Sequence, residues 1–165
     1  MLPAVGDVIG QGKPLYRIDG EPVVLLRGND VPVYRALSWG SEGADVRQLN
    51  AALVALGHAS AEDLDPASAY FGRQTYYALQ RFQEALGVEE TGELAVDQVI
   101  FLPIDELRVT KVDGTAGASA GPGQVLLTAS STAREVTVEL SASQQTQVAE
   151  GDDVTISLPN NRQTP

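Results

Sequence analysis

The chain has 165 residues, which suffices for one ordinary domain or for two or three small modules, but not for a large multidomain enzyme. Eleven Lys and Arg stand against 22 Asp and Glu, and the resulting net charge of −11 would repel a nucleic-acid backbone. The hydrophobic fraction of 43% is typical of a folded protein and not of a disordered one. We therefore expect a folded protein that has no nucleic-acid partner.

The residue types that several catalytic and metal sites require are scarce. Cysteine is absent and His58 is the only histidine, which excludes thiol catalysis, disulfides and zinc sites built from Cys and His. His58 follows a predicted helix, and the sequence has no nucleophile turn elsewhere, so we interpret it as a surface loop histidine. We predict no enzyme activity, no catalytic residue and no metal site.

The hydrophobic pattern predicts strands near both ends of the chain and helices between them. Residues 5–27 alternate short β-branched runs with Gly and Pro, which indicates short strands joined by tight turns. In residues 43–57 and 72–87 the apolar side chains recur at helical spacing, which predicts two helices. Residues 107–158 return to short runs of Val, Thr, Ile and Leu bounded by Gly, Ser or Asp, so we predict further strands there.

A repeated glycine pattern links the two predicted β regions. Two glycines six residues apart are followed by two apolar residues at fixed offsets in both regions: Gly6, Gly12, Leu15 and Ile18, then Gly117, Gly123, Leu126 and Ala129. Because each glycine can supply the positive φ of a turn, we expect the copies to pair as halves of one β-sandwich. The helical segment would then be inserted between them, with residues 30–35 and 99–103 as connectors. Chance recurrence among 16 glycines is the alternative.

The stretches LSWGSEGADVRQLNAALVALGH and YFGRQTYYALQRFQEALGVEETGEL, in residues 37–94, resemble the peptidoglycan-binding domain of bacterial wall hydrolases. The residues that match its pattern are Leu37, Gly40, Gly43, Asp45, Val46, Leu49, Leu53, Leu56, Gly57, Phe71, Gly72, Thr75, Ala78, Phe82, Gln83, Gly87, Thr91 and Gly92. One departure is Asn50, where the family usually has glutamine. Another is residues 92–103, where the family often has a third helix but this sequence is β-like.

Local chemistry gives most of these residues a structural role. Gly43 and Gly72 stand where the helices begin, and Gly57 and Gly87 follow the last apolar residue of each helix. Asp45 in a first helical turn favours the positive end of the helix dipole. We predict one small core composed of Val46, Leu49, Leu53, Leu56, Phe71, Ala78, Phe82 and Leu86.

The candidate ligand-binding residues lie outside these apolar stripes. Aromatic faces can stack on sugar rings, and arginine can hold the carboxylate of a peptide stem or a lactyl group with two hydrogen bonds. The candidates for peptidoglycan binding are Trp39, Arg47, Gln48, Tyr70, Arg73, Gln74, Tyr77 and Arg81. The alternative is that Tyr70 and its neighbour Tyr76 are edges of the core and that the arginines are merely solvated.

The flanking segments VGDVIGQGKPLYRIDGEPVVLL and RVTKVDGTAGASAGPGQVLLTAS resemble the two halves of the lipoyl-like, or barrel-sandwich hybrid, domain of haemolysin D-type membrane fusion proteins. This implies an α+β multidomain protein. Residues 1–30 and 104–132 would form the lipoyl-like β domain, and the peptidoglycan-binding-like helical domain with its connectors, residues 31–103, would be inserted between them. Residues 133–165 resemble the start of the adaptor β-barrel, with a short helix at 141–149.

The two resemblances together imply a non-enzymatic, extracytoplasmic adaptor subunit of a bacterial exporter, of ABC type, whose helical insert docks on cell-wall peptidoglycan. We associate this arrangement with Gram-positive, actinobacterial adaptors. The implied partners are peptidoglycan, the exporter transmembrane subunit and further copies of the full-length protein. We expect the protein to be anchored at the cell envelope by a membrane segment outside this sequence.

The sequence also allows two other functions, and its lysines bear on whether a cofactor is attached. The chain could be the wall-targeting portion of a peptidoglycan hydrolase, or a protein–protein module that has lost sugar binding. Lys13 and Lys111 are the only lysines, and neither lies in the sequence setting of a lipoyl-carrying or biotin-carrying turn. We therefore predict no cofactor.

Overall fold

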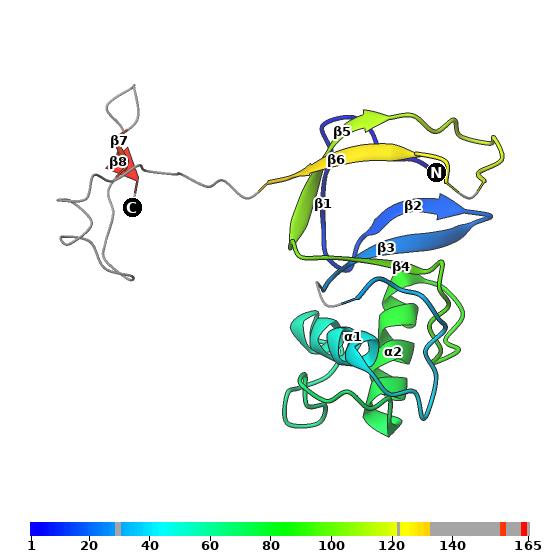
Figure 1. Ribbon diagram of the computed structural model, residues 1–165, viewed down its shortest axis with the longest axis vertical. Helices are drawn as coiled ribbons and strands as arrows, with labels where there is room; N and C mark the ends of the chain where they lie inside the picture. Colours follow the sequence, from blue (N-terminus) through cyan, green and yellow to red (C-terminus); the bar gives the residue numbers. More distant parts are fainter. Residues whose placement is uncertain (29–30, 122, 133–155, 158–162, 165) are drawn as a thin grey trace. The chain divides into compact units, whose positions relative to one another are not determined.

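The computed structural model describes residues 1–28, 31–121, 123–132, 156–157 and 163–164 (Figure 1). The contacts divide the chain into two units, Met1–Ala133 and Arg134–Pro165. In the second unit, β7 (Ile156–Ser157) pairs antiparallel with β8 (Gln163–Thr164). The helix predicted at 141–149 lies outside the described residues, so the assignment of residues 133–165 to an adaptor barrel stays a prediction.

One sheet of the first unit joins the two ends of that unit. Its strands are β1 (Val8–Gly10), β5 (Glu106–Val112) and β6 (Leu127–Ser131), in the antiparallel order β1-β5-β6. Val8 lies opposite Arg108 and Ile9 opposite Leu107. A strand that precedes the helices therefore pairs directly with a strand that follows them, as the inserted arrangement requires.

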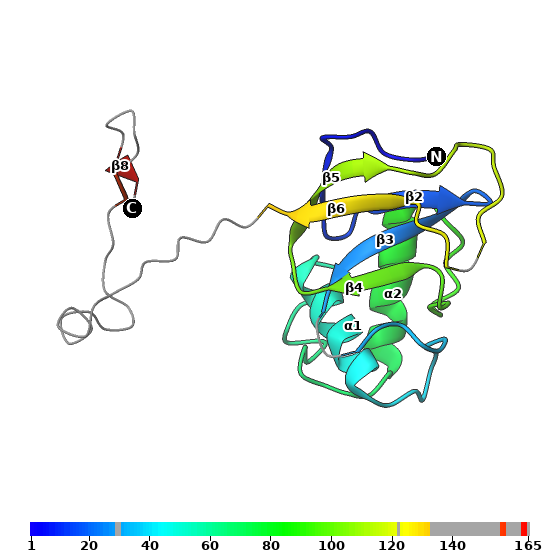
Figure 2. The same ribbon diagram turned by 45° about the horizontal axis from the view of Figure 1, so that its top comes forward.

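The second sheet also joins segments from both sides of the helices. Its strands are β2 (Pro14–Ile18), β3 (Glu21–Arg27) and β4 (Val99–Leu102), in the order β2-β3-β4. β2 and β3 form an antiparallel hairpin, whereas β3 and β4 run parallel (Figure 2). The expectation that residues 99–103 are only a connector is wrong, because the apolar run of β4 is long enough to extend the sheet.

The central strand β3 has a buried side chain on both faces. Val24 and Leu26 pack into the core that includes the helices, whereas Leu25 packs into a smaller core against β1 and β5. Strand side chains alternate between faces, so such a double burial is possible only for a strand between two layers. The unit has three layers: the helices, the sheet β2-β3-β4, and the sheet β1-β5-β6 (Figure 1).

The helices α1 (Ala44–Ala55) and α2 (Arg73–Leu86) begin and end where glycines allow it. Gly43 and Gly72 are their N-caps, and neither offers a side-chain hydrogen bond. Gly57 (φ 78°) and Gly87 (φ 70°) follow the helices in the left-handed region, which a side chain would disfavour. The predicted helix boundaries are confirmed. Neither helix in the described part of the chain is long and apolar enough to cross a bilayer.

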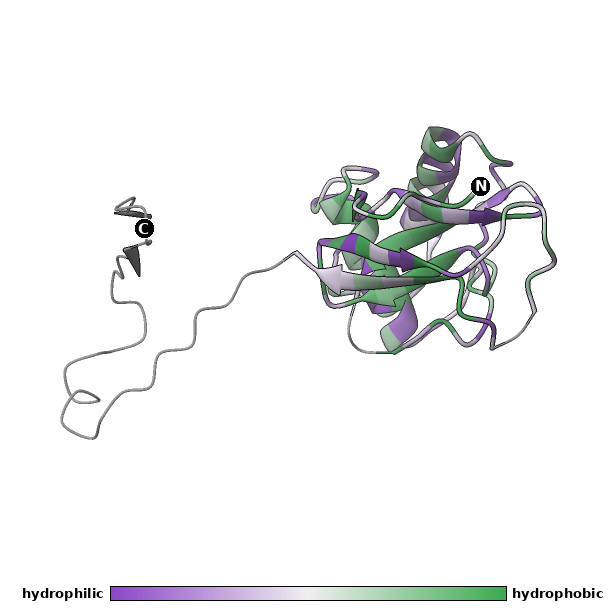
Figure 3. Ribbon diagram, turned by 90° about the horizontal axis from the view of Figure 1, so that it is seen from above, coloured by the Kyte–Doolittle hydropathy of each residue, from purple (hydrophilic) through white to green (hydrophobic). Residues whose placement is uncertain are grey.

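The predicted core of the helical segment is confirmed and is larger than the sequence indicated. Six of its eight predicted residues are buried, while Leu56 and Leu86 pack against its edge. Further members are Leu37, Leu64, Leu79 and Leu94, together with Val24, Leu26, Val99 and Phe101 from the strands. The predicted small core is therefore part of a larger one, because the sheet β2-β3-β4 supplies one wall. Hydrophobic residues accordingly fill the strands at the centre of the unit (Figure 3).

The glycine repeat has the backbone conformation that the sequence predicted. Gly6, Gly12, Gly117 and Gly123 all have positive φ, between 77° and 98°. Among the described residues the two sheets do not close into a barrel. The lipoyl-like assignment of residues 1–30 and 104–132 and the domain boundaries at 31 and 103 stay predictions.

Candidate functional site

Two loops of the helical domain, which we define as residues 37–94, lie side by side at the start of α2. Gly40 N donates to Phe71 O at 2.9 Å, Phe71 N to Ser41 O at 2.8 Å, and Gly43 N to Ala69 O at 2.9 Å. This short ladder places Trp39 on one loop and Tyr70 on the other. A Cβ added at Gly72 would lie 3.3 Å from the Tyr70 ring, so that ring lies over the N-cap of α2.

Three aromatic rings, Trp39, Tyr76 and Tyr77, are neighbours on this side of the helical domain, and we call them the aromatic surface. The Trp39 and Tyr76 centroids are 6.2 Å apart, and those of Tyr76 and Tyr77 are 5.5 Å apart with nearly perpendicular planes. Trp39 is 56% exposed and Tyr77 is 49% exposed. Large apolar side chains exposed together are a feature of binding sites rather than of an inert surface.

Tyr76 is the half-buried support of this surface. Its hydroxyl accepts a hydrogen bond from Gln80 Nε2 at 3.2 Å, and its ring lies so close to Gly92 that an added Cβ would collide with it. Tyr76 is thus a core-edge residue, as one sequence interpretation allowed, and its ring packs against those of Trp39 and Tyr77.

The polar candidates on α2 share one exposed face. Arg73, Tyr77 and Arg81 are four residues apart and solvent-exposed, and Gln74 lies beside them in the first turn. Arg81 Nε donates to His58 O at 2.6 Å and so ties α2 to the loop after α1. Arg73 and Gln74 are therefore the polar groups best placed to act with the aromatic surface, while Arg81 has a structural contact.

The two candidates on α1 have different surroundings. Arg47 is exposed but lines a cavity together with Arg27 of β3, away from the partners of Trp39. Gln48 is only 4% exposed. Its Nε2 donates to Val31 O at 2.6 Å, and its Oε1 accepts from Val31 N at 3.4 Å. The expectation that Gln48 lies on the surface is wrong, because its amide hydrogen-bonds the connector that enters the helical domain.

His58 follows α1 as expected, yet its ring is half-buried and not on the open surface. It packs edge-on against Phe82 with centroids 5.3 Å apart. Burial lowers the pKa of His58, and the nearby positive charge of Arg81 lowers it further. The imidazole is consequently neutral at neutral pH.

Gln83 of the family pattern and Asn50, which departs from that pattern, both hydrogen-bond loop backbone. Gln83 Nε2 donates to Glu93 O at 2.9 Å, and Gly92 N donates to Gln83 Oε1 at 2.8 Å. Asn50 Nδ2 donates to Ser68 O at 2.9 Å, so the shorter amide still reaches the loop before α2. Sequence reasoning did not assign these roles, because spacing does not reveal which loop returns to which helix.

An ion pair fixes the first turn of α1 to its entering segment. Arg35 Nε lies 2.7 Å from Asp45 Oδ2, and Asp45 is buried. The hydrogen bond from Arg35 keeps the pKa of Asp45 below its usual value, and the hydrogen bond from Val46 N acts in the same direction. Asp45 thus contributes an ion pair in addition to the helix-dipole effect that its position predicted.

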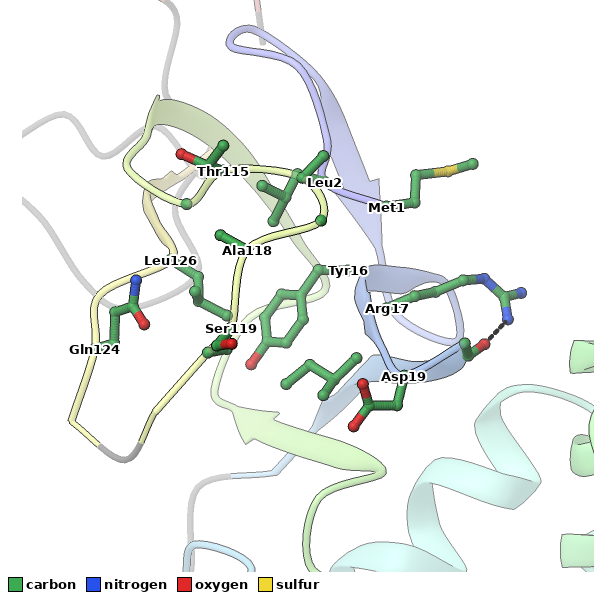
Figure 4. Close-up of a pocket in the computed structure, with 16 residues that line it drawn as sticks. Met1, Leu2, Tyr16, Arg17, Asp19, Thr115, Ala118, Ser119, Gln124 and Leu126 are labelled. Atoms are coloured by element: carbon green, nitrogen blue, oxygen red, sulfur yellow. Dashed lines mark hydrogen bonds between the residues drawn. The ribbon is translucent and has the colours of Figure 1, made fainter.

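A cavity of about 400 Å³ lies between the β2–β3 hairpin and the loop that precedes β6. Figure 4 shows Tyr16 near its centre, with Ala118 and Leu126 of that loop beside the ring. Burial raises the pKa of Tyr16, so its hydroxyl stays protonated. Arg17 Nη1 donates to Gly20 O at 2.8 Å and closes the hairpin. No group of three or more acidic or histidine side chains among the described residues could hold a metal ion.

Comparison with known proteins concerns the helical domain. A search of curated proteins and a search of solved structures gave no significant match. Residues 42–95 match the family model described as "Putative peptidoglycan binding domain". The matched stretch contains α1, α2, Tyr76 and Tyr77, and begins shortly after Trp39. The match supports a peptidoglycan-binding domain at residues 42–95 and, through it, an association with the cell wall.

Proposed function

We propose that the protein is a non-enzymatic, extracytoplasmic adaptor subunit of a bacterial exporter, and that its helical domain binds cell-wall peptidoglycan through the aromatic surface. The observation that carries the wall-binding part is the exposure of Trp39 and Tyr77 around the half-buried Tyr76. Aromatic faces of this kind stack on the apolar faces of sugar rings.

The charge of the protein favours recognition by stacking and hydrogen bonds over bulk attraction. A net charge of −11 repels the anionic polymers of a cell wall. Arg73, in the first turn of α2, lies one turn from Tyr77 and can hold a lactyl carboxylate beside a stacked sugar. The proposed glycan site therefore combines Trp39 and Tyr77 with the guanidinium of Arg73.

Co-sedimentation with purified insoluble peptidoglycan tests the glycan site. The double variant Trp39→Ala/Tyr77→Ala should lower the bound fraction at least tenfold, since stacking on two aromatic side chains is lost. Tyr34→Ala is the matched control, because Tyr34 is an exposed aromatic residue that packs against Arg35 and not against the aromatic surface. Equal retention of the double variant and the wild type would contradict the proposal and favour a module without sugar binding.

The adaptor part of the proposal is supported by how the strands flank the helical domain. β1 and β5 pair across the insertion, so the helical domain leaves from and returns to one β body. A helical insertion between paired β segments is the arrangement that the resemblance to membrane fusion proteins implies. Several adaptor copies around one exporter would also raise a weak affinity for the wall through multivalency.

Affinity purification of the full-length protein from detergent-solubilised native membranes tests the adaptor part. We expect recovery of an exporter transmembrane subunit, of ABC type, together with further copies of the protein. Recovery of a peptidoglycan hydrolase activity on the same polypeptide, without a membrane transport subunit, would instead assign the chain to the wall-targeting portion of a hydrolase.

A further inference from the structure

We infer that the cavity at the carboxyl end of α2 is a second sugar subsite, and that it takes the acetamido group of an N-acetylated amino sugar. This inference rests on the proposed wall binding, because it extends the glycan site from the aromatic surface along α2. Its walls come from the turn between β1 and β2, the loop after α1 and the last turn of α2.

The cavity has a volume of about 340 Å³ and lies between the strands and the helical domain. Lys13 lines it from the turn, His58 from the loop after α1, and Ala85 and Leu86 from α2. Its volume lies within the range of small-molecule sites, which often form where two structural parts meet. Residues from both parts can therefore converge on one ligand here.

The turn between β1 and β2 is held firmly in place. Gln11 N donates to Asp105 O at 2.7 Å, and Gly12 N donates to Leu25 O at 2.7 Å. Gly12 has φ 77°, and an added Cβ would lie 2.7 Å from Leu56 Cδ2 at the end of α1. Since the turn packs this closely on the helical domain, its wall of the cavity is preformed.

The lining combines an apolar wall with hydrogen-bonding groups, as an acetamido group requires. Leu56, Phe82 and Leu86 supply apolar surface for the methyl group. The neutral ring of His58 offers one N–H donor and one acceptor, and Lys13 adds an ammonium donor. The acetamido carbonyl can therefore accept a hydrogen bond and the acetamido N–H can donate one, while the methyl group is removed from water.

An uncharged ligand group also suits the charge of the protein. The net charge of −11 repels the anionic polymers of a cell wall. An acetamido group carries no charge, so its recognition needs no attraction between the protein and the whole polymer.

The cavity lies on the same face of α2 as Tyr77 of the aromatic surface. Tyr77, Arg81 and Ala85 follow one another at intervals of four residues, and all three are exposed. Eight residues of α-helix span about 12 Å, which a short oligosaccharide can bridge but a single sugar ring cannot. Arg81 lies between the two positions, and its Nε donates to His58 O, which fixes the loop that carries His58. One glycan strand can thus reach the aromatic rings and the cavity together.

Titration of the isotope-labelled full chain with tetra-N-acetylchitotetraose, followed by NMR, tests the inference. We expect saturable shifts of the amides of Gly12, His58 and Leu86 together with that of Tyr77. Cellotetraose has hydroxyl groups in place of the acetamido groups and should bind at least tenfold more weakly. N-acetylglucosamine alone should also bind at least tenfold more weakly, because it cannot reach both positions.

Two substitutions at exposed positions test the cavity itself. Ala85→Phe should weaken binding of the tetrasaccharide at least tenfold, because the added ring occupies the cavity. Ala55→Phe is the matched control, since Ala55 is exposed in the last turn of α1 and does not line this cavity. Lys13→Met keeps the length of the side chain without its ammonium group and should weaken binding at least threefold. Circular dichroism of each variant checks that it is folded.

The outcomes separate this subsite from the proposed glycan site. Wild-type affinity of both Ala85→Phe and Lys13→Met, or shifts confined to the aromatic surface, would overturn the inference and leave the glycan site standing. Equal binding of cellotetraose would also overturn it. If Trp39→Ala/Tyr77→Ala instead binds the tetrasaccharide as tightly as the wild type, with shifts at the cavity, the glycan site is contradicted and the acetamido subsite stands.

Discussion

The helical domain and the β body, which we define as strands β1 to β6, both turn at glycines with positive φ, but among the described residues the helical domain alone adds buried polar side chains to fix its loops. In the helical domain, buried polar side chains bind loop backbone, as Gln83 does at Gly92 and Asn50 at Ser68. In the β body, glycines with positive φ such as Gly6 and Gly123 form the turns. Side-chain hydrogen bonds specify one loop position, whereas glycine only permits a conformation. One loop fixed in this way, at Gly92, lies against the ring of Tyr76 in the aromatic surface.

The two regions also share a layer, because β3 has one face in each core. We expect Leu26→Ala, on the helical face, to lower the free energy of unfolding by about 2–5 kcal/mol, as large-to-small core substitutions do. Leu25→Ala, on the other face, is the matched variant, since both side chains are fully buried. Urea unfolding followed by Trp39 fluorescence and by far-ultraviolet circular dichroism measures both. Transitions that differ between the two probes would mean that the regions unfold independently.

Gly92→Ala tests whether a glycine of the helical domain does more than permit a turn. The new Cβ would meet the Tyr76 ring at a backbone φ of 66°, so we expect a loss of about 1–3 kcal/mol and a shifted Trp39 emission spectrum. Gly87→Ala is the control, with φ 70° and open space around an added Cβ. Thermal unfolding should show a smaller loss of stability for Gly87→Ala, and the Trp39 emission spectrum of this variant should be unchanged. Equal effects of both variants would reduce Gly92 to a turn residue.

The ion pair between Arg35 and Asp45 should make the stability of the helical domain depend on pH, unlike the exposed ion pair of the β body. The folded-state pKa of Asp45 is lowered, so its stabilising effect is present above the unfolded value and is lost as the pH falls below about 4. We expect Asp45→Asn to lower the free energy of unfolding by about 1–2 kcal/mol at pH 7. It should also make that free energy depend less on pH between about 4 and 2. Asp113→Asn, at an exposed pair of the β body, should do neither. Chemical denaturation across this range would show whether the two variants differ.

The smallest expected effect concerns His58, which links the two helices. Its folded-state pKa is lowered, so folding disfavours the protonated ring and stability falls as the pH drops below about 6.5. His58→Gln should remove this part of the pH dependence, which we expect to amount to a few tenths of a kcal/mol. Midpoints of thermal unfolding at about pH 7.5 and about pH 5.5, on either side of the ordinary histidine pKa, measure this pH dependence. A midpoint difference unchanged by the substitution would show that other groups cause the pH dependence.

Much of the fold follows from local sequence signals. Helical spacing and terminal glycines predict α1 and α2 with their boundaries, and the β-like pattern after Gly92 correctly replaces a third helix by β4. The candidate site was less predictable. Trp39 and Tyr77 are exposed as expected, but Gln48 is buried, because the connector that its amide binds is not encoded in the helical pattern. Arg47 lines a cavity with Arg27, and none of the three residues of the aromatic surface lines that cavity.

The sequence by itself determined the helices, the turn glycines, the acidic charge and the match of residues 42–95 to a peptidoglycan-binding domain, because each of these depends on neighbouring residues or on composition. Only the tertiary structure decided that β4 joins β3, that Leu25 and Leu26 have different cores, and that the amide of Gln48 binds the connector at Val31. These are contacts between distant segments, and packing of complementary surfaces, rather than any local preference, selects them.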